Sequence, residues 1–168
     1  MTGTSNRNFE PSSKTTRAMI ATILYRMAGS PETSKISGFT DVSSDSWYSS
    51  AATWCKANGI YDGLPDGSFH PNETITREQL AVVLKRFATY SNQITENSSN
   101  LGSFKDSSSI SSWAKDSVSW ALENSILTGY SDNTLQPQNM VTRAEFAQIL
   151  YNYFLKIGSD SITPLSEA

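Results

Sequence analysis

The stretch that decides the fold runs from Asp66 to Phe87 and has the sequence DGSFHPNETITREQLAVVLKRF. Its Asp-Gly and Pro-Asn pairs predict a turn and a short extended segment in front of a helix. Thr76 suits the N-cap of that helix, and Gln79 completes a capping box. The apolar residues that follow at i, i+3, i+4 and i+7 predict one buried helix face; they are Leu80, Val83, Leu84 and Phe87. Arg77 lies in the first helical turn, where the helix dipole disfavours a cation, so we expect an anionic group beside it.

The same stretch occurs three times without a gap, which indicates an internal repeat. A shift of 66 positions forward maps Thr76-Arg77 onto Thr142-Arg143, and a shift of 60 positions back maps it onto Thr16-Arg17. The apolar face repeats with it, as Ile20, Ile23, Leu24 and Met27 and as Phe146, Ile149, Leu150 and Tyr153. Three of the six arginines of the chain therefore occupy one repeat position.

Composition excludes several classes of protein. The chain has 168 residues and a net charge of -3, which provides no basic surface for nucleic acid. It has no apolar run long enough for a membrane span, and a single cysteine and a single histidine argue against a cysteine-based zinc site and against histidine-based catalysis. The Ser, Thr and Asn content suits a secreted surface protein. No signal peptide is visible at the N-terminus, so we expect either a cytoplasmic chain or a trimmed one.

The repeat is part of a longer helix-loop-helix unit that occurs at 39–90 and 104–157. Each long unit opens with a Phe-x-Asp motif, followed by a tryptophan and a helix; in the first of them the helix is expected near 47–58, with an αL cap at Gly59. A shorter unit at 6–28 has no such opening half. It also lacks the capping partner, since Met19 stands where Gln79 and Glu145 stand in the long units. We expect linkers at 29–38 and at 88–103, without a helix in the second, and a loose tail at 158–168.

These motifs resemble those of the S-layer homology domain family. The resemblance rests on Phe-x-Asp, the tryptophan, the Gly-Asp turn and the Thr-Arg motif, and it covers residues 6 to 155. It implies a mainly α fold of three tandem repeats in a pseudo-threefold arrangement, with the first repeat lacking its opening helix. It also implies a monomeric, non-catalytic module of the extracellular cell wall or surface layer. Its implied partner is a secondary cell-wall polysaccharide, a peptidoglycan-associated polymer that often carries pyruvate ketals.

The resemblance places the repeated arginine at the binding grooves. A guanidinium offers a planar fork matched to a carboxylate, and a helix N-terminus adds free N–H donors for the same anion. We therefore expect three anion contacts and four residues of the groove wall, namely Arg17, Arg77 and Arg143 in the first group and Trp47, Trp113, Asp41 and Asp106 in the second. We expect the groove of Arg17 to be the weakest, because its unit lacks a tryptophan helix.

Alternative interpretations stay open. The arginines are also suited to salt bridges with neighbouring repeats in a structural interaction module of a surface lattice, and Trp47 and Trp113 to the core. Trp54 and Trp120 are expected in the core, and Cys55 as a small buried hydrophobe. The segment 62–73 has the length of a calcium loop, but Leu64 stands where a ligand is required. We expect no metal, no cofactor and no catalytic residue.

Overall fold

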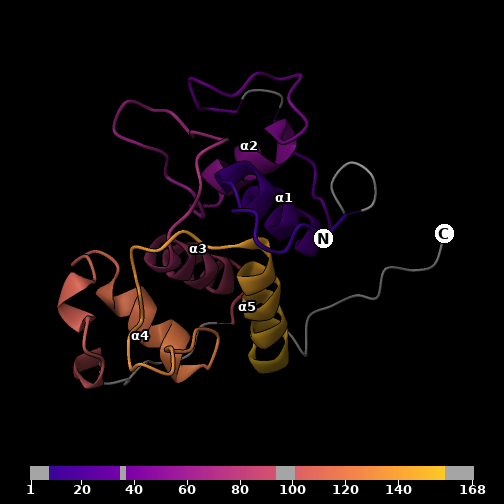
Figure 1. Ribbon diagram of the computed structural model, residues 1–168. Helices are drawn as coiled ribbons and strands as arrows, with labels where there is room; N and C mark the ends of the chain where they lie inside the picture. The colour runs from indigo at the N-terminus through magenta and orange to yellow at the C-terminus, as the bar shows by residue number, and fades with distance from the viewer. Residues whose placement is uncertain (1–7, 35–36, 94–100, 158–168) are drawn as a thin grey trace.

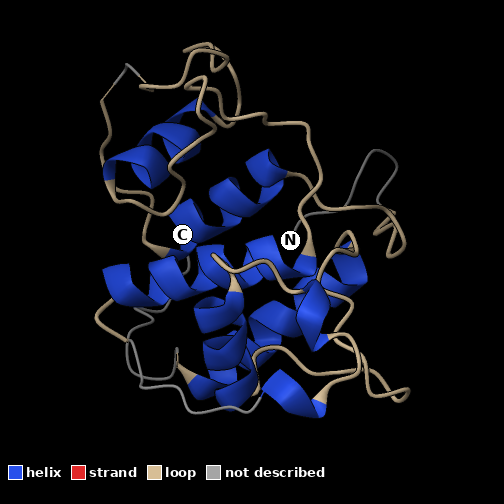
Figure 2. Ribbon diagram, turned by 90° about the vertical axis from the view of Figure 1, so that its left-hand side faces the viewer, coloured by secondary structure: helices blue, strands red, loops and turns tan. Residues whose placement is uncertain are grey.

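The computed structural model describes residues 8–34, 37–93 and 101–157, so the expected tail at 158–168 lies outside the described residues. The described residues contain five α-helices, which confirms the mainly α prediction (Figure 1). The helices are α1 (Arg17–Met27), α2 (Ser49–Ala57), α3 (Arg77–Tyr90), α4 (Lys115–Glu123) and α5 (Arg143–Lys156), with short 3-10 turns η2 (Leu101–Ser103) and η3 (Ser107–Ser109). No strand is present among these residues (Figure 2).

The helices α1, α3 and α5 begin where the repeated threonine predicts. Thr76 caps α3 in a full capping box with Gln79, and Thr142 caps α5 in the same way with Glu145. The Thr16 side chain accepts only from the Met19 N–H at the start of α1, since a methionine cannot return a hydrogen bond. The capping predictions are confirmed, including the weaker cap of the first repeat.

The extended residues in front of these three helices form a closed ring of backbone hydrogen bonds. The N–H of Thr15 donates to the carbonyl of Val141 at 2.9 Å, and the N–H of Val141 donates to Ile75 at 2.9 Å. The N–H of Ile75 returns to Thr15 at 3.3 Å. All three residues are fully buried. Each repeat therefore touches both others, so the three units form one body around this ring.

The first backbone N–H groups of these helices donate to carbonyls of the loop that precedes the helix of the next repeat. The N–H groups of Arg17 and Ala18 donate to the carbonyls of Glu73 and Pro71 at 2.9 and 3.0 Å. The equivalent groups of α3 and α5 follow the same pattern, with Arg77 to Asn139, Glu78 to Pro137, Arg143 to Ser13 and Ala144 to Pro11. The expectation of free N–H donors for an anion was therefore wrong, because backbone carbonyls of the next repeat occupy them.

The apolar faces meet in one continuous core. Figure 1 shows α2 alongside α1 and α4 alongside α3. Trp54 of α2 is 3% exposed and lies against Tyr25 of α1, with ring centroids 5.8 Å apart, and against Phe87 and Tyr90 of α3 at 6.3 and 5.0 Å. Trp120 is fully buried. Both tryptophans were expected in the core, and this is confirmed, as is the buried Cys55.

The region after Phe87 differs from the expected linker. Helix α3 continues to Tyr90, and residues 101–103 form η2, whereas no helix was expected over 88–103. The reason is tertiary: Ala88 is fully buried and Tyr90 packs on Trp54, so burial supports a helical turn that the polar sequence alone does not favour.

Helix α5 exposes a face whose counterpart in α1 and α3 is covered by neighbouring residues. Ala18 of α1 and Glu78 of α3 are 1% and 2% exposed at the position where Ala144 of α5 is exposed. About two helical turns further along, Tyr25 of α1 contacts Trp54, whereas the equivalent Tyr151 of α5 is 58% exposed. No helix among the described residues lies on α5 as α2 lies on α1.

Candidate functional site

Each repeated arginine reaches into the next repeat. The Nε of Arg17 donates to the carbonyl of Phe69 at 2.6 Å, and the Nε of Arg77 donates to Leu135 at 2.8 Å. The Nε of Arg143 closes the cycle by donating to Phe9 at 2.8 Å. We name these contacts junction 1–2, junction 2–3 and junction 3–1, after the repeats that they join. An arginine therefore shares its site with the loop of the following repeat and not with its own loop.

Aromatic rings complete the surroundings of the guanidinium groups. The Cζ of Arg17 lies 4.8 Å from the ring centroid of Tyr61 and 5.3 Å from that of Phe69. Arg77 lies 4.8 Å from Tyr130, and Arg143 lies 5.2 Å from Phe9. Carbonyl oxygens and π faces thus supply the negative potential that the position of the arginine in the helix requires.

The three arginines differ in access. Arg77 and Arg143 are 6% and 5% exposed, whereas Arg17 is half-buried. Arg77 uses a second donor inside the protein, since its Nη2 donates to the carbonyl of Thr128 at 2.8 Å. Within the described part of the chain, the Nη groups of Arg17 have no acceptor, and neither Arg17 nor Arg77 forms an ion pair. The salt-bridge alternative is therefore not supported for these two side chains.

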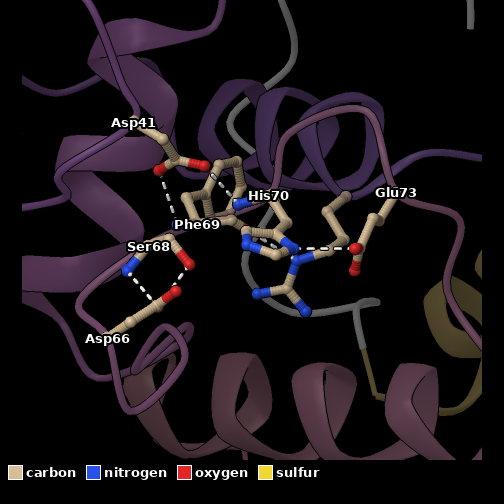
Figure 3. A network of polar contacts seen from close by, with 7 residues as sticks. Asp41, Asp66, Ser68, Phe69, His70 and Glu73 are labelled. Carbon is tan, nitrogen blue, oxygen red and sulfur yellow. Dashed lines mark hydrogen bonds and ion pairs between the residues drawn. The ribbon is translucent and has the colours of Figure 1, made fainter.

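Asp41 and Asp106 hold the loops that face the arginines. The carboxylate of Asp41 accepts from the N–H groups of Phe69 and His70 at 2.6 and 2.8 Å (Figure 3). Asp106 accepts in the same way from the N–H groups of Leu135 and Gln136, at 2.8 and 2.7 Å. Each carboxylate therefore positions the residue whose carbonyl binds the arginine of the preceding repeat.

Trp47 and Trp113 lie on the surface, with exposed fractions of 66% and 57%. The core alternative for them is therefore wrong. Trp47 connects to junction 1–2 through a series of rings: its centroid lies 5.2 Å from that of Tyr48, and Tyr48 lies 6.5 Å from Phe69. An exposed tryptophan at the same position of two units offers a flat apolar face at each.

Several residues of the junctions were not singled out from the sequence. Phe69 and Leu135 align with Phe9 in the repeat, and this alignment was a usable signal. Tyr61 and Tyr130 occupy different repeat positions, so nothing in the repeat pattern indicated them. Two turns near the junctions are closed by carboxylates. Ser68 donates to Asp66 (Figure 3), and Thr134 donates to Asp132. These hydrogen bonds lower the pKa of both acids.

Glu145 links the cap of α5 to junction 2–3. Its carboxylate accepts from the N–H and hydroxyl of Thr142 and, at 2.8 Å, from the hydroxyl of Tyr130, the residue under Arg77. Burial of Glu145 by itself favours the neutral acid. The hydrogen bonds from Thr142 and Tyr130 and the charge of Arg77 outweigh it, so the pKa of Glu145 is lowered from its ordinary value.

Glu145→Gln is expected to change how stability depends on pH. The folded pKa is lowered, so ionised Glu145 stabilises the fold above its ordinary pKa of 4.5, and this contribution is lost as pH falls through the folded pKa. Glutamine keeps a capping box, as Gln79 does in α3. Solvent screens this group, so we expect the variant to be less stable by no more than about 0.5 kcal/mol at pH 7, and by a smaller amount at pH 3. Urea unfolding at both pH values checks this, and a constant difference would contradict it.

Comparison with known families now identifies the repeat. The family model described as the S-layer homology domain matches residues 38–81 and 103–147, which together make up more than half of the chain. The chain belongs to the S-layer homology domain family. The two matches contain the two loops that face Arg17 and Arg77, together with Arg77 and Arg143 themselves.

Relatives of this S-layer homology module include enzymes and surface proteins. It is 32% identical to an amylopullulanase of Thermoanaerobacterium thermosulfurigenes over 94% of this chain and 8% of that protein. It is 32% identical to the surface-layer 125 kDa protein of Lysinibacillus sphaericus, over 88% of this chain and 12% of the relative. A cellulosome-anchoring protein of Acetivibrio thermocellus is 37% identical over 57% of this chain and 21% of its own length. The chain thus spans a small part of each relative, and modules of this type are typical of proteins anchored at the cell surface.

Among the described residues, none of the helices has the length and apolar character that crossing a membrane requires.

Proposed function

We propose that this chain is a non-catalytic anchoring module that binds an anionic secondary cell-wall polysaccharide, a polymer associated with peptidoglycan, outside the cell. Its three repeats surround the central ring in pseudo-threefold fashion. The observation that carries the proposal is the state of Arg17, which is oriented by Phe69 and two aromatic rings and keeps both Nη groups for an external acceptor.

The chemistry of junction 1–2 suits a carboxylate on a sugar. A guanidinium held by its Nε presents its Nη donors in a fixed direction, so little conformational entropy is lost when an anion binds. The exposed Trp47, linked to the junction through Tyr48, offers an apolar face for a sugar ring. At junction 2–3 the corresponding residues are Arg77 and the exposed Trp113, but Arg77 is more deeply buried and donates one Nη to Thr128. Ala114 and Leu135 stand there in place of Tyr48 and Phe69, so the series of rings is not repeated.

The relatives support anchoring over catalysis. The relatives include a cellulosome-anchoring protein and a surface-layer protein. This module matches only 8% of the amylopullulanase, so the similarity does not extend to most of that enzyme. We therefore assign no reaction to the module.

A thermodynamic cycle tests the assignment. Lysine keeps the charge of Arg17 but not its planar fork, so Arg17→Lys is expected to weaken binding to the purified polymer by roughly three- to tenfold. Chemical removal of the acidic substituent is expected to weaken wild type by a similar factor, and to cost Arg17→Lys much less, because groups that touch are non-additive. Isothermal titration of both proteins against both protein-free polymers provides the four affinities.

Two results would contradict the proposal. If the affinity losses from Arg17→Lys and from removal of the acidic substituent simply add, Arg17 does not contact that substituent. Failure of wild type to bind a polymer stripped of protein would favour a protein partner in a surface lattice. Lys14→Arg, an exposed change at the start of the first repeat, serves as a control and is expected to bind as wild type does.

A further inference from the structure

The residue before the repeated proline has the same unusual backbone in all three repeats. Glu10, His70 and Gln136 have φ angles of 51°, 53° and 50°, in the left-handed region that residues other than glycine rarely adopt. Each follows directly on the residue whose carbonyl binds an arginine, so each lies beside one junction. Strain that is kept in three copies indicates that the direction of this residue matters to the site.

The side chain at this position pairs with the residue three places later in every repeat. Glu10 accepts from the hydroxyl of Ser13 at 3.3 Å. The Nδ1 of His70 lies 2.7 Å from Glu73 Oε1 (Figure 3). Asn139 donates to Gln136 Oε1 at 2.6 Å. We call these three side-chain pairs the turn pairs of the three repeats. They share one backbone geometry but differ in chemistry: the first is an acid with a hydroxyl, the second an imidazole with an acid, and the third two amides.

The turn pairs give the junctions different charges. Junction 2–3 combines Arg77 with two neutral amides, and its turn pair does not titrate. Junction 3–1 combines Arg143 with the acid Glu10. At junction 1–2 the charge depends on pH. Within the set formed by the arginine and the turn pair alone, Arg17 and Glu73 cancel when His70 is neutral, and protonation of His70 adds one positive charge.

We propose that His70 makes junction 1–2 a pH-tuned anion site, which holds a sugar carboxylate more tightly when the imidazole is protonated, whereas Gln136 leaves junction 2–3 insensitive to pH. This inference rests on the proposed function. The charged groups around His70 are Glu73 on its own turn, Asp41 and Asp66 on the neighbouring loops, and Arg17 from α1.

The surroundings of His70 set the pH range. The hydrogen bond to Glu73 raises the pKa of His70 above its ordinary value of 6.5, and the charges of Asp66 and Asp41 act in the same direction. Asp41 itself is held by two backbone N–H groups, so its position does not change as His70 titrates. A raised pKa means that the protonated state, and with it the tighter binding, is present below about pH 6.5 and is lost as pH rises through the folded pKa.

The test measures each junction separately in the intact chain. The probe is a methyl glycoside that carries a pyruvate ketal, and its methyl ester is the uncharged control. Amide resonances of 68–73 and 134–139 in the ¹⁵N-labelled protein provide one affinity for each junction at pH 5.5 and at pH 8.5. We expect the acid to bind junction 1–2 about two- to fivefold more tightly at pH 5.5, with no such change at junction 2–3.

Exchange of the turn pairs provides matched variants. His70→Gln copies the residue of junction 2–3 and should abolish the pH dependence at junction 1–2. Gln136→His combined with Asn139→Glu should create it at junction 2–3. Because each residue already occurs at this backbone position, the variants are expected to fold, and a purely structural role of His70 would not transfer the pH dependence.

The outcomes separate the two proposals. If junction 1–2 prefers the acid over the ester equally at both pH values, the role of His70 is wrong and the proposed function stands. If neither junction prefers the acid over the ester at either pH, both proposals fail.

Discussion

Trp54→Ala is expected to lower the free energy of unfolding by about 3–5 kcal/mol, the range typical of a large aromatic removed from a well-packed core. Trp54 of α2 is 3% exposed and contacts rings of both α1 and α3, namely Tyr25, Phe87 and Tyr90. Its removal leaves a cavity between two repeats that the surrounding helices cannot fill. Equilibrium unfolding in urea measures the loss.

Trp47→Ala is the matched control from the same unit. Trp47 is 66% exposed, so its truncation should change stability by less than about 0.5 kcal/mol. The same variant should weaken binding to the wall polymer, because its exposed ring is assigned to the sugar. Equal losses of stability in the two variants would show that the division between core and surface tryptophans is wrong.

Arg17→Ala is expected to reduce polymer affinity roughly 10- to 100-fold, the range of a charge-assisted hydrogen bond to an anion. Arg143→Ala is expected to reduce it less than about threefold, because Arg143 donates to the carbonyl of Phe9, and the next residue, Glu10, is an acid that disfavours an anion there. Titration calorimetry with purified polymer compares the two variants.

A stability measurement has to accompany this comparison. Arg143 is 5% exposed and Arg17 is half-buried, so Arg143→Ala is expected to lose more stability while losing less affinity. Affinities are therefore compared at a temperature where thermal unfolding shows both variants to be folded. A loss at Arg143 that equals or exceeds the loss at Arg17 would contradict the assignment of sites to junctions.

This order reverses the one expected from the sequence. From the sequence, Arg17 is expected to act with its own short unit, and the weakest site is therefore expected there. In the structure Arg17 reaches the second unit, where Asp41 and Trp47 lie, and Arg143 is the arginine that meets the short unit. The repeat pattern contains no information on which loop an arginine meets.

The sequence by itself determined the features that depend on neighbouring residues. The threonine N-caps and the two capping boxes follow from side chains three residues apart, and the burial of Leu80 and Leu84 follows from helical periodicity. The αL conformation of Gly59 after α2 is a local property as well, since glycine adopts a positive φ without strain. The family resemblance rests on the same local motifs.

Only the tertiary structure decided what lies between the repeats. The ring of Thr15, Ile75 and Val141 joins three segments that lie 60, 66 and 126 residues apart in the chain. This arrangement directs each arginine to the loop of the following repeat, and carbonyls of that loop accept from the N–H groups at the helix N-terminus. The extension of α3 to Tyr90 depends on Trp54 in the same way. Backbone hydrogen bonds between distant segments are made by N–H and C=O groups that all residues except proline carry alike, so side-chain patterns do not specify them. Burial of the shared core selects the arrangement in which these groups are satisfied.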